Sequence, residues 1–488
     1  MIQSRTNPQT TYLTWLIVLG VLTVSGLIAA AAAASSLMVL AVVPVLIVIC
    51  LLLLKPHLGV YIVILAALVA PLEIGSGTTV ALNPVTMLLP VLLGIWFVGM
   101  FIHKEIRLVQ ARVFWPLGLF LLGSLLSLVI GTVIWDPFVP RPNNFLLVQL
   151  AQWGIFALSA AAFLFMGNLI RNEKALQRVT AVFLFVAGIL AILRVVSLAS
   201  GLPQLTVVAT GAITRSTFWM LLTAVAGGQL LFNNKLRLYQ RLFLIIVLVA
   251  VVIYSFVQQQ ETLSNWIGVG VAAVLLVWFR WPQIRWPAIM LLIAFLLSGM
   301  LLPFIWNVSG GDAEWWESGG SRLALIERVI EVTARNPITG IGPAAYRPYA
   351  RIRPLPYRGA FWPDPQVSAH NNYVDIYAHN GILGLILFAW FAFEVMRLGL
   401  RLRKQYKIGF TASYVNSMLA AGAGALTLML LADWVLPFVY NIGFFGFQAS
   451  VLIWFFIGGL VAVQTFPQAE KTVTKIMPHG AEAITQTL

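Results

Sequence analysis

Charged residues are scarce in this sequence. Asp, Glu, Lys and Arg together make up 9% of the 488 residues, whereas 60% of the residues are hydrophobic. An ordinary soluble domain is roughly a quarter charged, so too few polar side chains remain here to coat a water-facing surface. The composition excludes a soluble fold. It predicts an all-α membrane protein, because a helix satisfies its own backbone groups inside a bilayer.

Cysteine is nearly absent as well. The one cysteine, Cys50, lies in an apolar run, so no internal disulfide can form and the residue says nothing about the redox compartment. The formal net charge is +14, but in a membrane protein a basic balance reports on topology and on anionic lipids. We therefore expect membrane lipids as partners and no nucleic acid.

Apolar runs long enough for membrane-crossing helices recur along the chain, and we predict a polytopic helix bundle of about 14 (12–14) transmembrane helices. The first is interpreted as a retained helix and not as a signal peptide. The predicted spans lie near residues 11–34, 37–54, 58–71, 85–102, 114–135, 146–169, 179–198, 216–231, 242–257, 263–279, 287–305, 373–399, 413–436 and 444–463.

Along the chain, connecting loops rich in lysine and arginine alternate with loops that are nearly uncharged. One set of loops is basic, as in Arg171, Lys174 and Arg178, and is assigned with both termini to the cytoplasm. The other set is nearly uncharged until a long segment at residues 306–371. The predicted organisation is transmembrane helices 1–11 in residues 1–305, an extracytoplasmic catalytic loop in 306–371, helices 12–14 in 372–463 and a cytoplasmic tail in 464–488.

The long outer segment lacks lysine but is rich in arginine, against the positive-inside tendency. Its arginines are Arg322, Arg328, Arg335, Arg347, Arg351, Arg353 and Arg358. A guanidinium grips phosphate through two parallel hydrogen bonds, which an ammonium group cannot do. The cluster therefore indicates a diphosphate ligand at the outer membrane face. The plainer alternative is that these arginines bind lipid headgroups or pair with the acidic residues of the same loop.

An amphipathic helix is predicted over residues 321–336. Its apolar side would hold Leu323, Ile326 and Ile330, with Glu331 and Arg335 as an i,i+4 pair and Pro337 as the stop. We expect this helix to lie along the membrane surface. Arg328 and Arg335 would serve its solvated face. Arg322 would stand in its first turn, where the helix dipole disfavours a cation.

Two more arginines, Arg194 and Arg215, are predicted at the outer ends of spans, at or within the hydrocarbon boundary. A charge at the bilayer centre costs about 3 kcal/mol on insertion scales, so such residues are candidates for function. Both side chains could instead extend to the interface.

Histidine is also scarce, with five in the chain. His370 is placed where the outer loop meets the membrane, and a neutral imidazole there can take a proton from a hydroxyl as a general base. His379 is four residues from Asp375 on the same helix face, which favours a structural hydrogen-bonded pair. Gly381 and Gly384 are interpreted as packing positions that allow close helix approach.

These residues carry a family resemblance. The pattern is His, then Asn, Ser or Gln, nine residues, Gly, two residues, and Gly, Thr or Tyr. His370-Asn371, Gly381 and Gly384 fit it throughout. With the upstream stretch Gly320-Ser321-Arg322, the region from Gly319 to Phe388 resembles the bacterial O-antigen ligase and polymerase family. The stretch 213–218 around Arg215 is similar to a second arginine motif of that family, although the Asn-Pro-Asn that often follows is missing.

The resemblance implies a polytopic glycosyltransferase of the cytoplasmic (inner) membrane, active in lipopolysaccharide or other cell-envelope polysaccharide biosynthesis. Its donor would be a glycan on undecaprenyl or another polyprenyl diphosphate, and its acceptor a hydroxyl of a lipid core, a glycan or a protein at the outer face. His370, Arg322 and Arg215 would be catalytic. The substrate-binding residues would be Arg194, Arg347, Arg351, Arg353, Arg358 and Asn371. No metal or other cofactor is expected, because the sequence has no acidic pair or His/Cys spacing that would bind one.

Three alternatives stay open. A polymerase of the same family would use a second carrier-linked glycan as acceptor. A flippase or exporter of lipid-linked sugars would also need many spans, but its arginines would be scattered through them. A non-catalytic membrane scaffold would require neither the histidine motif nor the exclusion of lysine from the outer loop.

Overall fold

The computed structural model describes residues 55–467, except for gaps at residues 56, 71–73, 76–80, 103, 105–107, 201–210, 259–262, 301–302, 304–319, 353–354, 358–359 and 363–368. The regular secondary structure of the described chain is helical apart from two short antiparallel strand pairs. β1 (Ile74–Gly75) pairs with β2 (Ala81–Leu82), and β3 (Leu355–Tyr357) pairs with β4 (Ala360–Trp362). The predicted all-α class is confirmed, and the strands are confined to connections.

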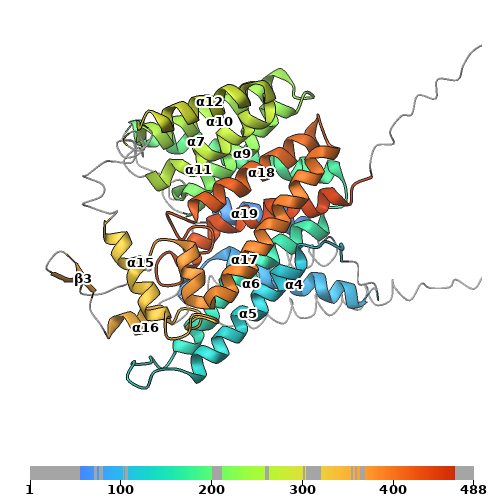
Figure 1. Ribbon diagram of the computed structural model, residues 1–488. Coiled ribbons are helices and arrows are strands. Elements are labelled where there is room, and N and C mark those ends of the chain that lie inside the picture. The colour runs from blue at the N-terminus through green and yellow to red at the C-terminus, as the bar shows by residue number, and fades with distance from the viewer. Residues whose placement is uncertain are drawn as a thin grey trace, which may run out of the picture.

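The helices follow the apolar runs of the sequence (Figure 1). The first group is α3 (Leu58–Val69), α4 (Pro84–Ile102), α5 (Phe114–Val133), α6 (Phe145–Leu169) and α7 (Glu173–Ser200). The second is α9 (Ser216–Phe232), α10 (Leu238–Ile253), α11 (Leu263–Arg280) and α12 (Arg285–Leu297). The third is α15 (Gly320–Thr333), α16 (Tyr346–Arg351), α17 (Asn372–Gln405), α18 (Phe410–Leu428) and α19 (Gly443–Gln464).

The chain is a membrane protein. Seven described helices are long and apolar enough to cross a membrane, and the number is eight if α11 and α12, which bend by 108° at their junction, count as one span. Two of the predicted spans, at residues 11–34 and 37–54, lie outside the described residues. Each of the others overlaps a helix, although α3, α9 and α12 are shorter than a full span and α18 ends before its predicted span does. The total of about fourteen stays a prediction.

Helix α19 forms the centre of the bundle. Its side chains are almost all buried, including Phe447, Phe455 and Phe456. It packs closely on α6 because a glycine, Gly458, faces the backbone of Phe163, where any side chain would collide. Small residues let membrane helices approach in this way. In Figure 1, α17, α18 and α19 lie together between the group of α7, α10 and α12 and the group of α4 and α5.

Helix α15 occupies the stretch of sequence where the amphipathic helix was predicted, but the side of the helix that is buried differs from the predicted side. The buried side holds Leu325 and Val329, whereas Leu323 and Ile330 are about half exposed, at 47% and 49%. Arg328 was predicted on the solvated face, but only 7% of it is exposed. It lies beside the buried Tyr346. Burial raises the pKa of this tyrosine, and the positive charge of Arg328 partly offsets the rise.

The predicted ion pair between Glu331 and Arg335 was wrong. Glu331 pairs with Arg328 at 2.6 Å, and Arg335 pairs with Asp136 in the loop that follows α5. The reason is tertiary: the end of α5 brings an acidic residue to the last turn of α15. Helices α15 and α16 therefore sit together at one end of the bundle, near the start of α17 (Figure 1).

Candidate functional site

The candidate site is built around an irregular segment, residues 429–442, which joins α18 to α19. We predicted a helical span over residues 413–436, but α18 ends at Leu428 and the chain then runs in turns. The prediction was wrong here because the segment is apolar and so resembles the end of a membrane helix. Irregular backbone at membrane depth is tolerated only where other groups bond its N–H and C=O groups.

Side chains from distant helices provide those bonds. Asn372 accepts hydrogen bonds from the backbone N–H groups of Val435 and Leu436 and donates to the Leu436 carbonyl. Gln152 of α6 accepts from Val439 N–H at 2.7 Å and donates to the Pro437 carbonyl at 3.1 Å. The segment is therefore held rigidly by α6 and α17 and keeps a fixed shape without being helical.

Asp433 is the charged residue of this segment, and its side chain is completely buried. One carboxylate oxygen accepts the Phe438 N–H at 3.2 Å, and the other accepts the Asn441 side-chain amide at 2.9 Å. A buried carboxylate is costly unless it is bonded and faces positive charge. Its surroundings are basic, because it lies close to both His370 and Arg215.

His370 stands immediately before α17, as predicted, and 36% of its side chain is exposed. Its Nδ1 is 3.9 Å from the Asp433 carboxylate. Its backbone is left-handed, with φ of 48°. This conformation is uncommon for residues other than glycine and often marks a functional site. The next residue, Asn371, caps α17 by accepting the N–H groups of Tyr373 and Val374. The cap fixes the position from which the imidazole projects.

Arg322 and Asn371 both bind the irregular segment. Arg322, near the start of α15, donates to the Leu431 carbonyl at 3.3 Å, and the Asn371 side-chain amide donates to the Leu430 carbonyl at 2.9 Å. Consecutive carbonyls thus receive bonds from two predicted site residues. The structure thereby brings Arg322 to the same segment as His370, although 48 positions separate them in the chain.

Arg215 approaches Asp433 from the start of α9. Its guanidinium lies 5.0 Å from the centroid of the Phe445 ring. Burial lowers the pKa of Arg215, and the charges of Asp433 and Tyr254 act against this shift. Arg194 lies near the same tyrosine. The two predicted boundary arginines are therefore neighbours, joined through Tyr254.

The other predicted arginines divide into two sets. Arg347 of α16 stacks on Tyr440 of the irregular segment, 4.5 Å from the ring centroid. Burial raises the pKa of Tyr440, while the charges of Arg347 and Arg351 lower it, so Arg351 is close as well. Arg353 and Arg358 lie outside the described residues. The described predicted site residues thus lie at or near the segment 429–442, except Arg194, which is related to it only through Tyr254 and Arg215.

His379 has a different place. It is buried two residues before the kink of α17 at Gly381, between the rings of Phe156 and Phe438. Its Nδ1 accepts the Ala344 N–H at 3.2 Å. The predicted pair with Asp375 was wrong. The cause is that the loop before α16 packs on this part of α17 and provides the donor.

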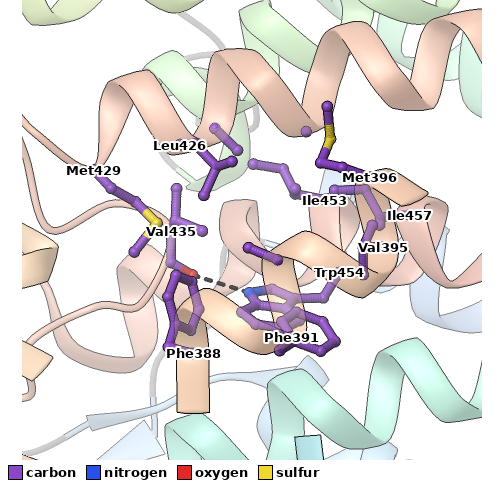
Figure 2. A pocket seen from close by; sticks show the side chains of 13 residues that line it. Phe388, Phe391, Val395, Met396, Leu426, Met429, Val435, Ile453, Trp454 and Ile457 are labelled. Atoms are coloured by element: carbon purple, nitrogen blue, oxygen red, sulfur yellow. Dashed lines mark hydrogen bonds between the residues drawn. The ribbon is translucent and has the colours of Figure 1, made fainter. Parts of the chain in front are cut away.

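An apolar cavity lies beneath the irregular segment, between α17, α18 and α19. It is shown in Figure 2, where Met429 and Val435 of the segment line one end and Met396 and Ile457 the other. The Trp454 indole donates to the Val435 carbonyl at 3.0 Å along one wall. The cavity has almost no polar surface, so it suits hydrocarbon.

Sequence reasoning missed Asp433, and with it the centre of the site. A signal was present. Asp433 is the one acidic residue between Glu394 and Glu470, in a stretch that otherwise reads as membrane. Intramembrane charges are candidates for function by default. In the part of the chain that the structure describes, no three His, Cys, Asp or Glu side chains are grouped in a way that could hold a metal ion.

Comparison with known families bears on the region that carries these residues. Residues 260–389 match the family model described as O-antigen ligase. A search of curated proteins finds no match to the chain. The matched region contains Arg322, Arg347, His370 and Asn371, together with the glycines of the histidine motif. The match confirms the predicted resemblance to the O-antigen ligase and polymerase family over residues 260–389.

Proposed function

We propose that this membrane protein transfers a glycan from a polyprenyl-diphosphate carrier to an acceptor hydroxyl. One observation carries the proposal. A histidine, a buried carboxylate and two arginines that are remote in sequence meet at one irregular segment, residues 429–442. A base and a set of guanidinium groups are the two requirements for displacing a diphosphate with an alcohol.

In the proposed reaction His370 is the general base. Its imidazole takes the proton of the acceptor hydroxyl while the oxygen attacks the anomeric carbon of the donor glycan. The bond from that carbon to the diphosphate breaks, and the electron pair leaves with the carrier diphosphate. Asp433 lies 3.9 Å from the imidazole. Its negative charge stabilises the imidazolium that forms and orients the ring.

Arg322 and Arg215 are proposed to hold the diphosphate and to neutralise the charge that develops on it. Arginine suits this task because its planar fork binds two oxygens at once and stays protonated. Arg347 and Arg351, which approach the segment from α16 around Tyr440, and Arg194 near Tyr254 assist in binding the donor. In this proposal the arginines do the work that a metal ion does in many soluble glycosyltransferases.

The apolar cavity under the segment supports the same assignment. The donor has an anionic head and a long hydrocarbon chain. Arg322 and Arg347 contact the irregular segment, and two residues of the same segment, Met429 and Val435, line the apolar cavity (Figure 2). The site is proposed to face the outer side of the cytoplasmic membrane, in line with the predicted extracytoplasmic loop at residues 306–371 and the basic loops on the opposite side.

The acceptor distinguishes a ligase from a polymerase. A ligase would use the lipid core of lipopolysaccharide or a protein, and a polymerase a second carrier-linked glycan. The match to a model described as O-antigen ligase favours the ligase. A flippase is favoured less, because its arginines would line a path through the spans, whereas Arg215, Arg322 and Arg347 meet at one segment.

The test is transfer by the purified protein in detergent. The protein is given a polyprenyl-diphosphate glycan and an acceptor in EDTA, and the release of the carrier diphosphate is measured. We expect release by the wild type, no more than a small residual release by His370→Ala, and wild-type release by His57→Ala, a control at an exposed histidine. Equal release by wild type and His370→Ala would remove His370 from the mechanism. Adding each candidate acceptor in turn then separates ligase from polymerase.

A further inference from the structure

A second cavity opens where the end of α5 meets α15 and α16, apart from the irregular segment. It encloses about 480 Å³. This volume is within the roughly 300–1,000 Å³ of small-molecule pockets. Its walls include Ile134, Trp135 and Asp136 after α5, Arg335 after α15 and Tyr349 of α16. We call it the α5–α16 pocket. Helices α15 and α16, which border it, lie together at one end of the bundle (Figure 1).

The two charged side chains that line this pocket form an ion pair, and the guanidinium of Arg141 lies beside the lining, 4.4 Å from the centroid of the Trp135 ring. Arg335 is bonded to Asp136, and the two side chains are 45% and 17% exposed. Asp136 is held in place because its backbone N–H donates to the Tyr349 hydroxyl at 3.0 Å and its carboxylate accepts the Phe138 N–H at 2.9 Å. A phosphate would have to compete with Asp136 for the guanidinium. A neutral polyol would not, since it can donate to the carboxylate and accept from the guanidinium at once.

The aromatic groups of the pocket complete the same pattern. The rings of Trp135 and Tyr349 lie 4.9 Å apart and inclined by 54°, and the Arg335 guanidinium is 5.5 Å from the centroid of Tyr349. A pyranose has apolar C–H faces and a rim of hydroxyls, so it suits a pocket in which aromatic rings lie beside a donor and acceptor pair.

Helix α16 connects this pocket to the proposed reaction site. Arg347 reaches Tyr440 of the irregular segment, and Tyr349, two residues further on, reaches Trp135. Two residues turn a helix by roughly 200°, so these side chains project from opposite faces of α16. The two sites are therefore separated by about the width of one helix, roughly 10 Å. A glycan of a few sugar residues can span that distance.

We propose that the α5–α16 pocket is a sugar subsite, which binds a neutral pyranose residue of the glycan some residues away from the bond that is made. The inference rests on the proposed function for the identity of the glycan. The sugar can come from the donor or from a glycan acceptor, and both present the same chemistry to the pocket.

The first experiment measures binding without turnover, so that it does not depend on the proposed reaction. Saturation-transfer NMR is recorded on the purified protein in a sugar-free amphipol, because maltoside detergents would compete. The probes are the methyl glycosides of glucose, galactose, mannose, rhamnose and N-acetylglucosamine. We expect transfer from wild type and its loss in Ile134→Trp, which places an indole in the pocket mouth. Val133→Trp, at the neighbouring and more exposed position outside the pocket, is the matched control.

The second experiment uses the reaction. Ile134→Trp is expected to raise the KM for a long-glycan donor about tenfold, the equivalent of one or two hydrogen bonds, with kcat unchanged. A donor with a single sugar should be unaffected. The same comparison with long and short acceptors identifies an acceptor subsite. Absence of saturation transfer from wild type, or equal transfer from Ile134→Trp and Val133→Trp, would overturn the subsite. If the wild type binds pyranosides but neither it nor the variants transfer the glycan, the result would instead count against the proposed reaction.

Discussion

Replacement of Asp433 by asparagine separates charge from shape at the proposed site. Asp433 is fully buried, and its two oxygens accept the Phe438 N–H and the Asn441 amide. Asparagine is nearly isosteric, but it replaces one acceptor by a donor, so one of these partners meets a second N–H group. The substitution also removes the negative charge that faces His370.

The expected size of the effect follows from the distance. Two unit charges 3.9 Å apart interact by roughly 4 kcal/mol at an effective dielectric constant of 20. His370 is 36% exposed, so solvent screens part of this interaction. We expect the imidazolium of the transition state to lose about 2–4 kcal/mol of stabilisation, which lowers kcat by about 30- to 1,000-fold. The mismatched hydrogen bond should destabilise the fold by about 1–3 kcal/mol.

The assay is the rate of carrier-diphosphate release by purified Asp433→Asn, with thermal unfolding measured in parallel. The interaction with His370 is tested in a double-mutant cycle. In a His370→Ala background there is no imidazolium to stabilise, so Asp433→Asn should change the residual rate little. Folded Asp433→Asn protein that retains more than about a third of the wild-type rate would refute the reasoning, as would an equal loss in both backgrounds.

Two further predictions concern other parts of the site. Arg322→Lys keeps the charge but loses the planar fork, so kcat/KM for the donor should fall about tenfold or more, with little change in Tm. An unchanged kcat/KM would show that Arg322 acts only as a point charge. Gly381→Ala should lower Tm and the yield of folded protein by an equivalent of about 2 kcal/mol or more, because Gly381 has φ of +63° and an added Cβ would collide with the Ile338 carbonyl. Gly94→Ala, which meets nothing within 4 Å, is its control and should behave as wild type.

The helices were predictable because a bilayer imposes a length and a composition on them. The runs that became α4, α5 and α6 could be read to within about two residues at each end. The short helices were harder. α9 has 17 residues and is almost entirely buried in protein, so its apolar character reflects packing and not contact with lipid. Composition alone cannot separate these two causes.

The orientation of α15 could not be read from its sequence. Apolar residues occur on more than one side of this helix, and the choice between Leu323 and Leu325 as the buried side depends on what packs against it. The structure buries Leu325 and, with it, Arg328. Single-sequence periodicity places an amphipathic helix but does not identify its partner. The predicted position along the membrane surface stays a prediction.

The histidine and arginine candidates could be found from the sequence because their chemistry is rare in this composition. His370 is one of five histidines, and the outer loop contains arginine without lysine. The sequence could not predict that these residues lie close together in the folded protein. Their proximity depends on bonds such as those from Arg322 to Leu431 and from Asn371 to Leu430, which join segments that are remote in the chain.

The irregular segment explains why the site is where it is. A helix that ran on past Leu428 would bond its own carbonyls, and Leu430 and Leu431 would have none to offer to Asn371 and Arg322. By leaving the helix, the chain presents free backbone groups that Asn372 and Gln152 partly satisfy, and these bonds fix Asp433 beside His370. The side chains that satisfy the non-helical backbone in the membrane therefore also fix Asp433 beside the proposed base, His370. A variant in which α18 continued as a helix would lose these hydrogen bonds and the position of Asp433.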